Sequence, residues 1–142
     1  MTEVRGERRR VLFVCEHDAG RSRMCAAYLQ EMAGDRYEAL SAGLEPAHGL
    51  RLEAAASLSE DGLTVVDGPG RQLTPEMAAA VDRIVTLGFT LNPEVARDVP
   101  REEWGIPSPA GRQMQEVRVI RDTIRRLVER LVARLDTEAV VR

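Results

Sequence analysis

The feature that most constrains this chain is an apolar run, Val11 to Val14, which leads directly into the seven-residue segment 15–21, CEHDAGR. Four apolar residues without polar alternation are typical of a strand buried on both faces of a parallel sheet. Behind this segment, apolar residues recur at helical spacing from Ser22 to Met32, and Gly34 supplies a stop. A buried strand, a loop and an amphipathic helix therefore follow one another.

The rest of the chain repeats this alternation. Strands are predicted over 37–42 and 83–87, each followed by a glycine, and a weaker strand between Val99 and Trp104. Helices are predicted over 50–60, from Thr74 through Val81, and over 114–135. Strands that alternate with helices form βαβ units with a parallel sheet. We therefore expect an α/β fold with one domain over residues 1–142, including a frayed polar leader at 1–8.

Composition and charge exclude several classes of function. The net charge of -3 and the pI of about 5.5 leave no net-positive surface for nucleic acid. No apolar stretch approaches the ~20 residues that a membrane span requires, and two cysteines are too few for a secreted disulfide scaffold. We expect a cytoplasmic protein, a monomer or weak homodimer, with no bound metal or cofactor and no nucleic-acid or membrane partner.

The last predicted helix carries arginines on the face opposite its apolar stripe, beside Asp122 and Glu129. This pattern is typical of a solvated face with ion pairs one turn apart. A basic docking surface is the alternative interpretation.

The loop after the first strand has the composition of an oxyanion site. Five residues separate Cys15 from Arg21, enough for successive amides to curl inward and form an anion nest capped by a helix N-terminus. The same partial charges favour the thiolate of Cys15, and Ser22 can donate a hydrogen bond to it. The planar guanidinium of Arg21 can hold two oxygens of an oxyanion. The candidate oxyanion-binding residues are Glu16, His17, Asp18, Ala19, Gly20 and Arg21; the candidate catalytic residues are Cys15, Arg21 and Ser22.

Several motifs carry a resemblance to a known family. They are residues 11–15 (VLFVC), 17–24 (HDAGRSRM), 41–43 (SAG), 81–87 (VDRIVTL) and 103–110 (EWGIPSPA). Together they resemble the low-molecular-weight protein tyrosine phosphatases and, more closely, the single-cysteine arsenate reductases that share their fold. The resemblance spans residues 10 to about 135.

This resemblance implies a three-layer fold, with a four-stranded parallel sheet in the order 2-1-3-4 flanked by helices. It also implies that Cys15 attacks phosphorus or arsenic while Arg21 and the loop amides stabilise the transition state. The family's acid loop normally places an aspartate before the proline, where it protonates the leaving group. Here that position is Ser108, whose hydroxyl is too weak an acid for this role.

The loop itself also departs from the family pattern, because Asp18 replaces an asparagine and Glu16 lies two residues earlier. Asp tolerates the left-handed conformation expected there. Its carboxylate either repels a bound dianion or points away and accepts backbone N–H bonds, with Glu16 in solvent.

The cysteines limit the redox chemistry that the resemblance implies. Thioredoxin-coupled arsenate reductases carry further cysteines after the third strand, where this chain has Gly88 and then none. A low-molecular-weight thiol as co-substrate needs only Cys15. Cys25 is either a small buried hydrophobe or a disulfide partner for Cys15.

Two functions are open on the sequence. The first is a Cys-based phosphatase or arsenate reductase that acts on an aryl phosphate or arsenate, with phosphate, arsenate or a phosphotyrosine-like group as ligand. The alternative is a weak or inactive relative that binds an oxyanion or a phosphorylated partner. Three residues favour the first function: Cys15, Arg21 and Ser22. Three others favour the second: Ser108, Asp18 and Glu16.

Overall fold

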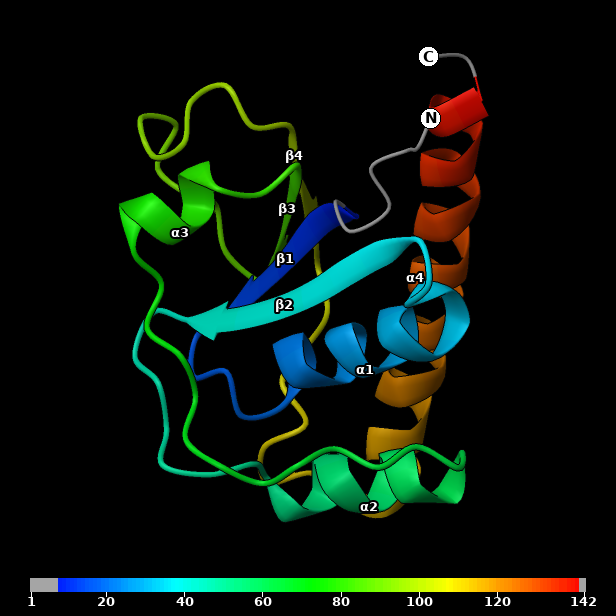
Figure 1. The fold of residues 1–142 in the computed structure, drawn as a ribbon. Helices are drawn as coiled ribbons and strands as arrows, with labels where there is room; N and C mark the ends of the chain where they lie inside the picture. The colour runs from blue at the N-terminus through cyan, green and yellow to red at the C-terminus, as the bar shows by residue number, and fades with distance from the viewer. Residues whose placement is uncertain (1–7, 141–142) are drawn as a thin grey trace.

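The computed structural model describes residues 8–140, and Figure 1 shows its fold. The strands are β1 (Arg9–Cys15), β2 (Tyr37–Gly43), β3 (Arg83–Leu87) and β4 (Arg101–Trp104). The helices are α1 (Arg21–Ala33), α2 (Leu52–Glu60), α3 (Pro75–Ala79) and α4 (Met114–Val140). Each of the predicted elements is present; β3 has the predicted ends, and the ends of the others are shifted. Most of the expected leader at 1–8 lies outside the described residues.

The four strands form one parallel sheet in the order β2-β1-β3-β4, which confirms the expected topology. β1 is central and pairs with β2 along its whole length, so that Cys15 lies beside Gly43. Because all strands run in one direction, their carboxyl ends meet at a single edge of the sheet. That edge is where parallel sheets bind ligands, and Cys15 ends β1 there.

Side chains of β1 alternate between two hydrophobic cores, one on each face of the sheet. Val11 and Phe13 belong to the larger core, which includes residues of α1, α2 and α4. Leu12 and Val14 belong to the smaller core, which includes Ala78 of α3. Figure 1 shows α1 and α4 together on one side of the sheet and α3 on the other. The three layers follow from a strand that is apolar on both faces.

The helix ends differ from the sequence prediction for local reasons. α3 ends at Ala79 rather than Val81, because the N–H of Ala80 bonds back to Met77 in a tight turn that leads into β3. α4 continues past Leu135 to Val140, where Arg83 forms an ion pair with Glu138.

Three arginines on the polar face of α4 form ion pairs with acidic residues at the end of α2, and two of them also pair with Asp122 of α4 itself. Arg118 and Arg121 both bind Glu60, and Arg125 binds Asp61. The hydrogen bond from Arg118 is the main cause that lowers the pKa of Glu60 to about 2. These pairs fix the end of α2 against α4.

No helix within residues 8–140 is both long enough and apolar enough to cross a membrane.

The buried stripe of α4 should dominate its contribution to stability. Ile124 is fully buried in the larger core, whereas Val119 on the same helix is 64% exposed. We expect Ile124→Ala to lower the free energy of unfolding by about 2–5 kcal/mol through lost burial and a residual cavity. Val119→Ala should change it by less than about 0.5 kcal/mol. Urea denaturation of both variants compares them; equal losses would contradict this packing.

Candidate oxyanion site

The loop between β1 and α1 turns its carbonyl groups outward. Those of Cys15, Glu16, His17, Ala19 and Gly20 accept backbone N–H bonds from Leu44, Glu45, Ala47, Arg51 and Met24, respectively. The N–H groups of residues 16–20 find no acceptor between residues 8 and 140. Free amides in a tight loop before a helix N-terminus are suited to binding an anion. The loop therefore has the donor set that its sequence predicts.

Arg21, the first residue of α1, spans from this loop to the next two strands of the sheet. Its Nη1 donates to the carbonyl of Ile106 at 2.9 Å and, at 3.4 Å, to that of Leu87. These bonds leave the Nε and Nη2 donors of the guanidinium available for a ligand. Gly88 makes room for this arrangement, because a Cβ at Gly88 would lie 2.7 Å from Nη1.

Asp18 lies behind the loop, away from the ligand side. Its φ of 49° is the left-handed conformation expected there, and the residue is 1% exposed. Oδ2 accepts the backbone N–H of Arg71 at 2.9 Å. Gly43 and Gly70 allow this close approach, since a Cβ at either would come within about 3 Å of the Asp18 residue. Of the two orientations considered from sequence, the one that accepts a backbone N–H is confirmed.

Ser22 connects this carboxylate with Cys15. Its Oγ lies 3.0 Å from Cys15 Sγ and donates to Asp18 Oδ1 at 2.6 Å. The predicted contact between Ser22 and Cys15 is therefore present, but Ser22 has a second partner that sequence reasoning missed.

Cys25 lies on the buried face of α1 in the same core as Cys15. Burial is the main cause that raises the pKa of its thiol well above the usual value. Buried thiols of this kind are inert, and both cysteines are free. Cys25 thus has the environment of a packing residue.

The mouth of the site is lined by residues from three loops. His17, Arg51, Ser108 and Pro109 line a narrow pocket above Cys15. Ser108 therefore lies at the site, as the acid-loop resemblance implies, and its Oγ accepts the N–H of Ala110. Arg51 has no sequence signal for this site, because its place at the mouth depends on a hydrogen bond from its backbone N–H to the carbonyl of Ala19.

Glu16 and His17 face outward at this mouth. The Glu16 side chain is 58% exposed, in agreement with the solvent orientation considered from sequence. His17 Nδ1 bonds the carbonyl of Glu45 at 2.8 Å, which holds the ring to the loop after β2.

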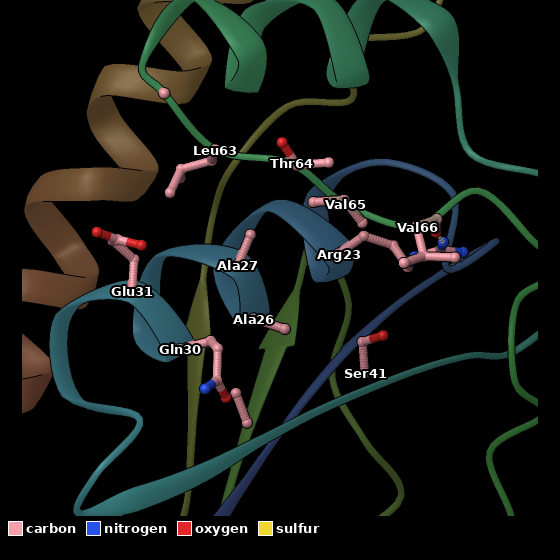
Figure 2. A pocket seen from close by; sticks show the side chains of 12 residues that line it. Arg23, Ala26, Ala27, Gln30, Glu31, Ser41, Leu63, Thr64, Val65 and Val66 are labelled. Carbon is pink, nitrogen blue, oxygen red and sulfur yellow. Dashed lines mark hydrogen bonds between the residues drawn. The ribbon is translucent and has the colours of Figure 1, made fainter.

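A larger groove of about 410 Å³ lies over α1, between β2 and residues 62–66 (Figure 2). Ala26, Ala27 and Ala39 line it, with Arg23 and Glu31 at its sides. Arg23 is occupied there by the carbonyls of Val66 and Gly68. None of residues 15–22 lines this groove, so it is separate from the pocket above Cys15.

The fold and this loop define a class: a parallel α/β domain with a cysteine under an oxyanion nest and an arginine beside it. The family profile described as Low molecular weight phosphotyrosine protein phosphatase matches residues 10–141. The chain belongs to this phosphatase and arsenate reductase superfamily.

Individual relatives carry different activities in their names. Arsenate reductase 1 of Staphylococcus epidermidis is 26% identical over 91% of this chain and 99% of its own length. The structure of the YwlE arginine phosphatase from Geobacillus stearothermophilus is 26% identical, with a TM-score of 0.78 over 93% of this chain and 96% of that one. An arsenate reductase described in the phosphate binding state has a TM-score of 0.79 at 24% identity, over 89% and 98% of the two chains.

Gly88 offers a test of how Arg21 is placed. A Cβ there meets Arg21 Nη1 and also strains a backbone at φ +84°, whereas Gly105 has nothing within 4 Å of an added Cβ. We expect Gly88→Ala to weaken phosphate binding by roughly tenfold or more, the loss of a charge-assisted contact. Gly105→Ala should bind normally. Protection of Cys15 from alkylation by phosphate measures both; equal protection would contradict the assigned role of Arg21.

Proposed function

We propose that this chain is a Cys-based enzyme that acts on an aryl phosphate or on arsenate, with Cys15 as the nucleophile. The observation that carries the proposal is the placement of Cys15 at the end of β1, under a loop with free amides and beside Arg21. Sγ would attack the phosphorus or arsenic atom. The amides of residues 16–21 and the free edge of Arg21 would stabilise the equatorial oxygens.

Ser108 narrows the range of substrates in this proposal. It lines the mouth at the acid-loop position, and its hydroxyl cannot protonate a departing alkoxide. Substrates whose leaving groups depart without a proton are therefore favoured. Among phosphate esters, these are aryl phosphates with acidic phenols.

With arsenate as the substrate, a low-molecular-weight thiol would serve as the reductant. Cys25 is buried, and no other cysteine is present in the sequence. An external thiolate would attack Sγ of the Cys15–arsenic adduct, so that a mixed disulfide forms while the S–As electron pair stays on arsenic and arsenite leaves. A second thiol would then free Cys15 and form an external disulfide. Free thiols at both cysteines fit a cytoplasmic location. The protein would act there as a monomer or weak homodimer.

The second candidate is a binding protein for an oxyanion or a phosphorylated partner. Ser108 favours it, because a binding nest needs no general acid. The two candidates differ in turnover, not in ligand.

Turnover and its dependence on Cys15 separate them. We expect the wild type to hydrolyse an activated aryl phosphate or to reduce arsenate with a thiol, and Cys15→Ser to abolish that activity because serine is not ionised there. Release of the phenol and of arsenite are the measurements. Phosphate binding without turnover above the Cys15→Ser control would support the binding protein instead.

Ser108→Asp tests the missing acid. We expect it to raise turnover of substrates with poor leaving groups by about 10²-fold and to leave turnover of activated aryl phosphates nearly unchanged. Ser108→Asn is the matched control, since it has the same shape and an acceptor for Ala110 N–H but no proton of the required acidity. Equal gains in both variants would show that the effect is not acid catalysis.

Arg51 is proposed to attract the dianion at the mouth. We expect Arg51→Ala to raise the KM several-fold with little change in kcat, because a partly exposed cation at the rim contributes mainly to ground-state binding. Arg71→Ala removes the same charge from an exposed position outside the pocket lining and serves as the control. A matching rise in both variants would indicate a general charge effect.

A further inference from the structure

Three buried side chains form a continuous contact from the nucleophile into the protein. Cys15, Ser22 and Asp18 are 2%, 0% and 1% exposed. Ser22 Oγ lies between the other two, 3.0 Å from Sγ and 2.6 Å from Asp18 Oδ1. Cys15 and Asp18 share no direct contact among the hydrogen bonds of residues 8–140. Ser22 is therefore the link between them.

The number of hydrogens on the Ser22 hydroxyl fixes which group donates in each of these two contacts. A serine hydroxyl has one hydrogen, and an ionised carboxylate can only accept. A separation of 2.6 Å is typical of a hydroxyl that donates to a carboxylate. When Asp18 is ionised, Ser22 gives its only hydrogen to Asp18. Its contact with Cys15 can then be made only by a thiol that donates to Oγ.

We propose that Cys15 and Asp18 share one proton through Ser22, and that Asp18 holds Cys15 as a thiol until the nucleophile is used. In the resting form Asp18 is ionised and Cys15 is protonated. To form the thiolate, the Sγ–H bond breaks and its proton passes to Ser22 Oγ, while the hydroxyl proton of Ser22 passes to Asp18 Oδ1. Ser22 then donates to the thiolate, and the pair keeps a single negative charge throughout.

This inference concerns the nucleophile of the proposed function and deepens it. Asp18 is a positioning residue, because it acts on Cys15 through Ser22 and does not touch the ligand. An approaching dianion meets one negative charge on the pair rather than two. The loop amides and Arg21 still favour the thiolate, and Asp18 opposes them by taking the hydrogen that Ser22 would otherwise donate.

Other charged and titratable groups surround the pair but do not contact Ser22. Arg21 borders Cys15, and the Arg23 guanidinium bonds the backbone carbonyl of Asp18, not its carboxylate. The remaining groups near Cys15 are Glu16, His17, Cys25 and Arg51. None of them is hydrogen-bonded to Ser22, so their influence on Cys15 does not depend on the Ser22 hydroxyl.

Replacing the Asp18 carboxylate by an amide should reverse the direction of the hydrogen bonds that link residue 18, Ser22 and Cys15. In Asp18→Asn the amide can donate to Ser22 Oγ, which frees the hydroxyl hydrogen for the thiolate. We expect the pH inflection for alkylation of Cys15 by iodoacetamide to fall by about 1–2 pH units relative to wild type, the equivalent of one charge-assisted hydrogen bond. Asn accepts the left-handed backbone at this position.

Ser22→Ala separates the relay from a simple charge effect. In the Ser22→Ala background, Asp18→Asn should shift the inflection by only a small remainder, because no hydroxyl connects the two groups. The same full shift in both backgrounds would overturn the relay, since Asp18 would then act through space. No downward shift in Asp18→Asn itself would also overturn it.

A measurement on the native sequence keeps the proposal testable if a variant fails to fold. The infrared S–H band of Cys15, obtained as the wild type minus Cys15→Ser difference at neutral pH, should be present. Its absence would show that Cys15 rests as a thiolate and would refute the proposal. None of these readouts needs turnover, so an inactive protein could still confirm the relay, and an active one could still refute it.

Discussion

The site depends on one property of the 15–20 backbone: its carbonyl groups are used by neighbouring segments and its amides are not. Bonds from Leu44, Glu45, Ala47 and Arg51 hold the outer side of the loop. A buried backbone carbonyl without a partner is costly, so these bonds determine which way each peptide faces. The residues that supply them follow β2 and precede α2. The peptide orientation of the loop therefore depends on backbone contacts with the segment between β2 and α2.

The sequence predicted the frame of this site well because its signals are local. An apolar run with both faces buried identified β1, and helical spacing identified α1, so Cys15 could be placed between them. The order of the strands came from the family resemblance. What the sequence could not predict depends on contacts between distant segments. The orientation of Asp18 is fixed by Arg71, and Arg51 reaches the mouth only because α2 begins beside the loop.

The surroundings of Asp18 and Glu16 determine how their charges affect the site. From the sequence alone, Asp18 and Glu16 could place two negative charges close to a bound dianion. In the fold, Glu16 faces solvent and Asp18 is turned into the protein, so neither blocks the nest. The effect of Asp18 is instead on the hydrogen of Ser22. A charge that seemed to oppose binding becomes one that governs the nucleophile.

Arg21 and the segment that carries Ser108 are joined, and this has a consequence beyond the site. Arg21 donates to the carbonyl of Ile106, and an added Cβ at Gly20 would meet the Pro109 ring at 3.3 Å. One guanidinium therefore both stands beside the free amides and holds the backbone of the segment after β4. A substitution that displaces residues 106–109 would displace Arg21 as well, although it lies outside the loop that carries Cys15.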